Sequence, residues 1–332
     1  MSSASCLRER LREDQPLILD GGLGTELEAE EPRAEGDMLW SARFLFSNPD
    51  LIKEMHDRFI ISGADIITTA TYQASIPGFV SHLGLSVGDS RKLLMSGVYL
   101  AKEAAEKRSD LKWRKSAFVA GSVGPYGAHL ANGSEYKGTY AARLTVERLK
   151  DFHRPHIECL VDAGADVIAF ETIPSIKECQ ALVEVLREFP SSEAWMSFSC
   201  GDHKTIADGS LFTDAVQMAC RSKQLLAVGV NCCPPDVVEP LLDAAQSLLP
   251  PEMTWVAYPN KWDAWDTKLG WLSGKPAAWL PDLSHKWIKQ GVGLIGGCCF
   301  VRPADIAWLR QHLKGDDAKC EPNDCPTTES TS

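Results

Sequence analysis

Short runs of apolar, mostly β-branched residues recur along the chain and are separated by longer segments in which apolar residues follow a helical period. Runs of four to eight such residues are typical of buried strands, and a spacing of three to four places apolar side chains on one helix face. The pattern predicts eight strands, at residues 17–20, 65–71, 117–122, 166–172, 194–200, 226–232, 254–259 and 293–297. Strands that alternate with helices in this way favour a parallel sheet.

The junctions between predicted helices and strands resemble one another. Residues 62–67 (SGADII) resemble residues 163–168 (AGADVI), and residues 290–295 (QGVGLI) are a looser third copy. In each copy a glycine ends a helix and an apolar strand begins at once, as in a repeated βα unit. Eight such units favour a single closed (βα)8 barrel, the TIM barrel, over an open doubly wound sheet.

The end of the chain lacks this pattern. Residues 315–332 are polar, contain proline and have no apolar period, which is typical of a disordered segment. We therefore expect one barrel domain over residues 1–314 and a disordered polar tail over residues 315–332. Three long βα loops, at residues 28–46, 125–139 and 260–282, are expected to cover a substrate at the C-terminal ends of the strands, where barrel enzymes have their active sites.

Charge and composition narrow the range of functions. The formal net charge of −11 argues against a nucleic-acid-binding protein, because such a protein presents a basic face. No apolar run reaches the ~18 residues of a membrane span. The charged first residues, MSSASCLRERLRE, do not resemble a secretory signal. We expect a cytoplasmic protein that acts on small molecules, with no nucleic-acid or membrane partner.

The chain contains 11 cysteines. An odd number in a chain without a secretion signal does not indicate a disulfide framework. Two adjacent pairs, Cys232-Cys233 and Cys298-Cys299, follow the sixth and eighth predicted strands, so a barrel would bring both pairs to one rim. Thiolates gathered there are suited to Zn²⁺. Buried cysteine that packs as a small apolar side chain is the alternative.

Backbone geometry limits how many of these thiols can reach one metal. Pro234 holds Cys233 extended, and successive side chains of an extended segment point to opposite sides. Only one of Cys232 and Cys233 is therefore expected at the metal.

The second pair has a different backbone. Gly296 and Gly297 can adopt conformations closed to other residues, which would let Cys298 and Cys299 turn to a common point. The resulting three ligands leave one position open, as in catalytic zinc sites. Such a site can present a substrate thiol as a nucleophilic thiolate, and its net charge of −1 suits alkyl transfer better than water activation. A barrel that binds metal or senses oxidants through its thiols without catalysis is the alternative from another class.

Three motifs resemble the homocysteine S-methyltransferase family: DGG at residues 20–22, GVNC at residues 229–232 and GGCC at residues 296–299. The similarity runs from about residue 16 to residue 313. Members of this family fold as (βα)8 barrels, depend on zinc and methylate homocysteine to methionine. The resemblance therefore implies a zinc-dependent methyltransferase whose open metal position receives the homocysteine sulfur.

The resemblance also assigns roles to single residues. It implies that the zinc ligands are Cys232, Cys298 and Cys299. Asp20 and Glu171 would bind the homocysteine ammonium group, although an aspartate before two glycines is also a common turn residue. Thr69 would lie beside homocysteine, although threonine is common in strands. Asn231 either orders its loop or contacts the substrate. No catalytic residue is expected beyond the zinc site.

The methyl donor needs an activated methyl group, as in sulfonium or quaternary ammonium compounds, and such cations bind over aromatic rings. Trp40 is the best candidate for this contact, and Tyr72 is the second. The segments GPYG (124–127), NGSEY (132–136) and LWSA (39–42) resemble the branch of the family that uses S-methylmethionine. We expect S-methylmethionine as donor, S-adenosylmethionine as a poorer one, and betaine as the alternative. Without the C-terminal arm that assembles the betaine enzymes, a monomer is expected.

His153 and His156 lie three residues apart on a predicted helix and resemble a helical metal pair. The cysteines at the strand ends are the better metal candidates, and a solvated helix face is favoured for this pair instead.

Overall fold

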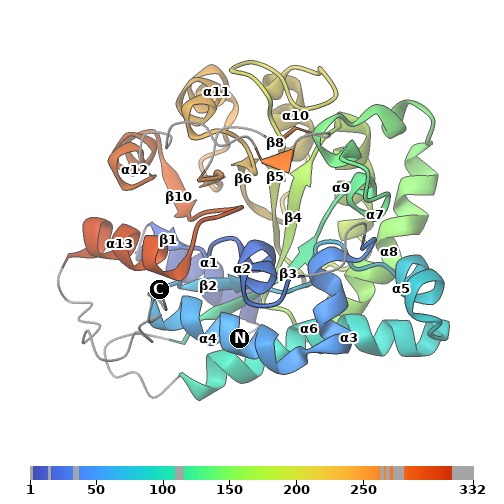
Figure 1. Ribbon diagram of the computed structural model, residues 1–332. Helices are drawn as coiled ribbons and strands as arrows, with labels where there is room; N and C mark the ends of the chain where they lie inside the picture. Colours follow the sequence, from blue (N-terminus) through green and yellow to red (C-terminus); the bar gives the residue numbers. More distant parts are fainter. Residues whose placement is uncertain are drawn as a thin grey trace.

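In the computed structural model, a ring of parallel strands is surrounded by helices (Figure 1). The structure describes residues 3–13, 16–32, 37–108, 116–261, 265–266, 270–271 and 280–315. The strands of the main sheet are β1 (Leu17–Ile18), β2 (Ile66–Thr68), β3 (Phe118–Val123), β4 (Val167–Ile173), β5 (Ala194–Phe198), β6 (Leu225–Asn231), β7 (Thr254–Tyr258) and β10 (Val292–Ile295). Two further strands, β8 (Trp265–Asp266) and β9 (Gly270–Trp271), pair with each other antiparallel.

The main sheet closes on itself. Its strand order is β1-β10-β7-β6-β5-β4-β3-β2, and a parallel bridge between Leu19 and Ile66 joins the two end strands. At this seam Asp65 donates its backbone N–H to Ile18, at 2.6 Å, and Asp20 donates to Ile66, at 3.0 Å. Each of the eight predicted strands has a counterpart, so the predicted (βα)8 barrel is confirmed.

Helices connect successive strands and cover the outside of the barrel (Figure 1). The α-helices are α1 (Ser3–Glu13), α2 (Leu23–Glu30), α3 (Phe44–Ser47), α4 (Pro49–Ile61), α5 (Ile76–Leu83), α6 (Val87–Lys107), α7 (Tyr126–His129), α8 (Val146–Asp162), α9 (Ile176–Leu186), α10 (Phe212–Ala219), α11 (Val238–Ala245), α12 (Leu280–Lys289) and α13 (Pro303–Lys314). Short 3-10 helices are η1 (Trp40–Arg43), η2 (Ser134–Tyr136), η3 (Thr139–Ala142), η4 (Pro235–Val237) and η5 (Gln246–Leu248).

The repeated junctions have the predicted geometry. The glycine that ends the helix has a left-handed backbone in all three copies, with φ of +104°, +83° and +94° at Gly63, Gly164 and Gly291. The aspartate of the first two copies caps the neighbouring strand. Asp65 accepts the N–H of Ile18 at 3.0 Å, and Asp166 accepts that of Val119 at 2.8 Å. The sequence repeat thus encodes both the helix stop and the entry of the next strand.

The interior of the barrel differs between its two ends. Toward the N-terminal ends of the strands it is filled by apolar side chains, including Ile66, Trp195 and Leu294, and Leu7 and Leu11 of α1 pack against this cluster. At the C-terminal ends the buried side chains are largely polar, because Asp20, Thr69, Glu171 and Asn231 end their strands there. Buried polar side chains of the barrel interior therefore gather at the C-terminal rim.

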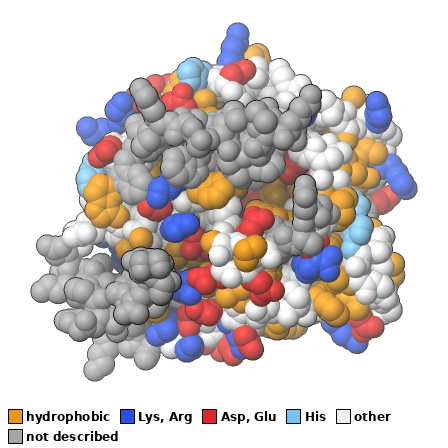
Figure 2. Space-filling model, in the orientation of Figure 1, with side chains coloured by type: hydrophobic (Ala, Val, Ile, Leu, Met, Phe, Trp, Pro, Cys, Tyr) orange, Lys and Arg blue, Asp and Glu red, His pale blue; other side chains and the backbone are white. Residues whose placement is uncertain are grey.

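The surface and the ends of the chain add two observations. No helix within the described ranges is both long enough and apolar enough to cross a membrane. Lys and Arg side chains on the described part of the face in Figure 2 lie scattered and do not form one continuous patch. Residues 316–332 of the predicted tail, and most of the predicted loop at 260–282, lie outside the described residues.

His56 on α4 makes the stability of the fold dependent on pH. It is fully buried, and neither ring nitrogen has a hydrogen-bond partner among the described residues. Burial lowers its pKa to about 4, whereas an unfolded histidine has a pKa near 6.5. The unfolded chain therefore binds more protons as the pH falls below about 6.5, and the free energy of unfolding decreases until about pH 4.

Replacing His56 by leucine is expected to remove this contribution without loss of a hydrogen bond. Between pH 7 and pH 5.5 the free energy of unfolding should fall by about 1 kcal/mol less in His56→Leu than in the parent chain. Urea denaturation at both pH values measures the difference. An unchanged pH dependence would show that His56 is not held neutral in the folded state.

Candidate functional site

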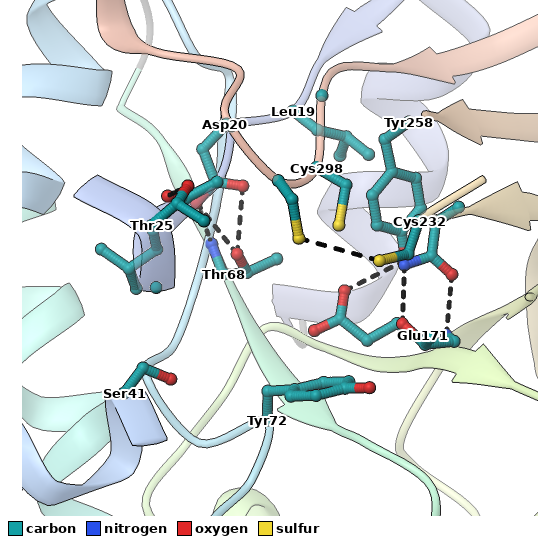
Figure 3. A pocket seen from close by; sticks show the side chains of 18 of the residues that line it. Leu19, Asp20, Thr25, Ser41, Thr68, Tyr72, Glu171, Cys232, Tyr258 and Cys298 are labelled. Atoms are coloured by element: carbon teal, nitrogen blue, oxygen red, sulfur yellow. Dashed lines mark hydrogen bonds between the residues drawn. The ribbon is translucent and has the colours of Figure 1, made fainter. Parts of the chain in front are cut away.

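A pocket opens at the C-terminal ends of the barrel strands (Figure 3). In Figure 3, Asp20 and Thr68 lie on one side of the pocket and Cys232 and Cys298 on the other, with Tyr72 across from them. The side chains that line it include Asp20, Thr25, Trp40, Ser41, Thr68, Thr69, Tyr72, Tyr136, Glu171, Thr172, Asn231, Cys232, Tyr258, Cys298 and Cys299.

Three of the cysteines form a cluster, which we call the cysteine trio: Cys232, Cys298 and Cys299. Their sulfurs lie within 4.8 Å of one another, and the Sγ atoms of Cys232 and Cys299 are 3.8 Å apart. Hydrogen bonds from Cys298 and Cys299 hold the pKa of Cys232 well below its ordinary value. The same hydrogen bonds to Cys232 raise the pKa of the other two thiols. The three thiols are therefore linked by hydrogen bonds as well as by position.

Cys233 lies apart from the trio, in the hydrophobic core. It is 1% exposed, and burial raises the pKa of its thiol well above the ordinary value. The extended backbone expected for this pair is wrong at Cys232, whose φ of +50° lies in the left-handed region. The local bend at Cys232, rather than strand alternation, turns the two side chains apart.

The role predicted for Gly296 and Gly297 is also wrong, because neither has a positive φ. Both are needed for close packing. A Cβ on Gly296 would lie 2.6 Å from the Cβ of Leu19, and one on Gly297 would lie 2.2 Å from Cγ1 of Val301. The left-handed residue of this loop is Phe300, at φ +64°, directly after the last cysteine of the trio.

Backbone strain is concentrated at this pocket. Five described residues other than glycine have positive φ. Trp40, Thr172 and Cys232 among them line the pocket, and Phe300 adjoins it. Such conformations cost about 1–3 kcal/mol each and tend to cluster at functional sites. The strain independently marks this rim as the functional part of the barrel.

Two buried carboxyl groups face the pocket. Asp20 accepts hydrogen bonds from the backbone N–H of Thr68, at 2.7 Å, and from its hydroxyl, at 3.0 Å. Glu171 accepts one from the hydroxyl of Ser122 and one from that of Tyr258, the latter at 3.2 Å. Burial raises the pKa of Asp20 to about 8 and that of Glu171 to about 7. Among the described lining residues there is no lysine, arginine or histidine, so the pocket favours a cationic group.

Asn231 and Thr69 line the pocket, but their side-chain oxygens accept hydrogen bonds from neighbouring strands of the barrel. The side-chain oxygen of Asn231 accepts the N–H of Thr172, at 2.7 Å, and the hydroxyl of Ser197, at 2.9 Å. The hydroxyl of Thr69 accepts the N–H of Ser122 at 2.9 Å. Asn231 was expected either to order its loop or to contact the substrate. The observed contacts are of the ordering kind, and they join strands β4, β5 and β6.

The side of the pocket lined by Trp40 and Tyr72 is aromatic. The rings of Trp40 and Tyr72 meet edge to face, with centroids 6.3 Å apart and an angle of 81°. Each ring packs closely on a glycine: a Cβ on Gly24 would lie 2.4 Å from the Trp40 ring, and one on Gly124 would lie 2.8 Å from the Tyr72 ring. The two glycines therefore fix where the rings lie.

Sequence reasoning missed several residues of this site. Tyr136 places its hydroxyl 3.4 Å from the sulfur of Cys232. Tyr258 receives the indole N–H of Trp195 at 3.0 Å and supports Glu171. Tyr258 could have been found, because it ends its strand as Asp20 and Glu171 end theirs. Tyr136 lies in a loop without periodic pattern and gave no such signal.

The expectation of a solvated face for His153 and His156 is wrong. They are 0% and 4% exposed. The Nε2 atom of His153 lies 2.8 Å from the buried carboxylate of Glu178, which also accepts the N–H of Tyr126, at 2.7 Å, and the hydroxyl of Tyr140. We call these four residues the Glu178 cluster. A buried carboxylate requires such partners, and they fix the loop that carries Tyr136.

Comparison with known proteins identifies relatives. Residues 17–313 match the family described as homocysteine S-methyltransferase. The chain is 40% identical over 318 residues to homocysteine S-methyltransferase 1 of Zea mays, covering 90% of this chain and 94% of the relative. It is 35% identical over 320 residues to betaine-homocysteine S-methyltransferase of Drosophila melanogaster, covering 91% and 96%. The crystal structure of the homocysteine methyltransferase MmuM from Escherichia coli, in its metallated form, superposes with a TM-score of 0.81 at 40% identity, covering 92% of this chain and 98% of that one.

Proposed function

Because this chain belongs to the homocysteine S-methyltransferase family, we propose that it transfers a methyl group from S-methylmethionine to the sulfur of homocysteine, which gives two molecules of methionine. The observation that carries the proposal is the arrangement of the pocket. The cysteine trio lies at one side and the carboxyl groups of Asp20 and Glu171 face the same space. One end of the pocket thus suits a sulfur held by a metal, and the other suits an ammonium group.

The cysteine trio fits zinc. Four ligands in a tetrahedron with Zn–S bonds of about 2.3 Å lie about 3.8 Å from one another. The Cys232–Cys299 separation of 3.8 Å matches this value without rearrangement. Cys232, Cys298 and Cys299 would hold the ion. When bound, zinc would favour the thiolate form of the homocysteine thiol at neutral pH.

Asp20 and Glu171 would orient homocysteine through its ammonium group. Burial raises the pKa of both carboxyl groups, and a neighbouring negative charge adds to the shift, that of Glu171 at Asp20 and that of Cys232 at Glu171. An entering ammonium group would offset the burial and the repulsion together. Thr68 and Tyr258 keep the two carboxyl groups in place, so that the substrate sulfur is directed toward the trio. Thr69 and Asn231 would contribute to the wall beside homocysteine.

The donor assignment follows from the three segments that resemble the branch using S-methylmethionine, and charge supports it. Trp40 and Tyr72 offer aromatic faces to an onium methyl group. The acidic pocket favours a donor with a net positive charge. S-methylmethionine carries a sulfonium and an ammonium group against one carboxylate, whereas betaine has no net charge. S-adenosylmethionine shares the sulfonium but brings an adenosyl group that the pocket must also admit, so it should be the poorer donor.

A donor comparison tests the proposal. The zinc-loaded protein is given homocysteine and each donor in turn, and methionine is quantified. We expect kcat/KM for S-methylmethionine to exceed that for betaine by about 100-fold, which corresponds to about 2.7 kcal/mol. Chelation should abolish the reaction and added zinc should restore it. Faster reaction with betaine would overturn the donor assignment, and no methionine from any donor would overturn the function.

A further inference from the structure

Tyr136 approaches the cysteine trio from outside the barrel strands. It belongs to η2, in the long loop between β3 and α8, and it lines the pocket. Its hydroxyl lies 3.4 Å from the sulfur of Cys232. The trio and the two carboxyl groups are acidic, and the described lining residues include no cation. The Tyr136 hydroxyl is thus a neutral hydrogen-bonding group directed at one sulfur of the trio.

We propose that Tyr136 is a positioning residue that donates a hydrogen bond from its hydroxyl to the Cys232 thiolate and thereby tunes the metal that the trio holds. The inference rests on the proposed metal site and deepens it. A thiolate carries no proton, so the hydroxyl must be the donor. A hydrogen bond to a coordinating sulfur withdraws electron density from it, and outer contacts of this kind change metal affinity or activity by about 10–100-fold.

The loop that carries Tyr136 is anchored at two points, one within η2 and one in η3. The hydroxyl of Ser199 donates to the backbone oxygen of Glu135 at 2.9 Å. On the other side Tyr140 donates to Glu178, the centre of the Glu178 cluster. The left-handed Gly138, at φ +62°, makes the turn between these two anchors. The tyrosine hydroxyl is therefore held in position before any substrate enters, as a tuning contact requires.

Cobalt(II) substitution gives a readout that does not depend on catalysis. In Tyr136→Phe the sulfur-to-cobalt charge-transfer band should move to longer wavelength, because the lone pair of Cys232 loses a stabilising hydrogen bond. The kcat/KM for homocysteine should fall about 10-fold in the zinc enzyme. Tyr126→Phe is the matched control. It removes a hydroxyl from the same loop, does not line the pocket, and packs its ring 4.8 Å from Phe152. Its spectrum should equal that of the parent protein.

A second variant covers the case in which Tyr136→Phe disturbs folding, which circular dichroism would reveal. A fluorinated tyrosine at position 136 is a stronger hydrogen-bond donor and should move the band to shorter wavelength. An unchanged band in folded, cobalt-loaded variants would overturn the role of Tyr136 and leave methyl transfer intact. Failure of the parent protein to bind cobalt through its thiols would instead overturn the metal site of the proposed function.

Discussion

Replacing Cys232 by alanine is expected to lower kcat/KM for methyl transfer to homocysteine by at least about 10³-fold, a loss of about 4 kcal/mol of transition-state stabilisation. Cys232 is the one member of the cysteine trio that follows β6, whereas the other two follow β10. Without it, two sulfurs of one loop remain, and two ligands do not make a stable zinc site. Metal analysis should show one zinc per parent chain and a large loss in Cys232→Ala.

Cys233 provides a matched control one residue away. It is buried, like Cys232, but packs in the hydrophobic core instead of lining the pocket. Cys233→Ala should keep its zinc and its activity, and its free energy of unfolding should fall by about 1 kcal/mol because a small buried side chain is truncated. Equal loss of zinc in both variants would mean that the two thiols share the metal and that the trio is assigned wrongly.

The barrel was predictable because its strands are buried on both faces. A parallel strand inside a barrel is a short apolar run, and glycine must follow each helix that ends in a left-handed turn, as at Gly63 and Gly164. The same logic brought Asp20, Glu171 and Cys232 to one rim, since residues that end parallel strands meet there. The type of these residues and their place at predicted strand ends were sufficient to predict that they meet at this rim.

The remaining parts of the site depend on contacts that no local pattern records. Ser199 and Glu178 hold the loop that carries Tyr136, and Glu178 binds Tyr140 and His153, which lie 38 and 25 residues from it in sequence. No local pattern marked His153 as buried, but a buried carboxylate overrides local polarity by recruiting a partner. Gly296 has no room for a side chain because Leu19, from the opposite end of the chain, packs against it. Such long-range contacts are visible only in the folded structure.

Replacing Glu171 by glutamine is expected to raise KM for homocysteine by about 30-fold or more, since loss of one partner of a buried charge pair costs about 2–5 kcal/mol. Glutamine keeps the size of the side chain and can still bond to Ser122 and Tyr258, which hold Glu171 in the parent protein. The KM for the methyl donor should rise less than that for homocysteine, because the carboxylate is expected to contact the homocysteine ammonium group directly. The interaction that Glu171→Gln is expected to remove is the attraction between the Glu171 carboxylate and the substrate ammonium group.

A thiol without an ammonium group separates this effect from general damage to the pocket. 4-Sulfanylbutanoate has the chain of homocysteine and lacks only the amino group. The parent protein should prefer homocysteine over this analogue by about 10²-fold or more, because a site built for a polar group rejects a substrate that lacks it. In Glu171→Gln the preference should shrink, since the analogue never used the missing charge and homocysteine did. If both thiols lost activity in the same proportion, Glu171 would serve the architecture of β4 and Asp20 alone would remain as the partner of the ammonium group.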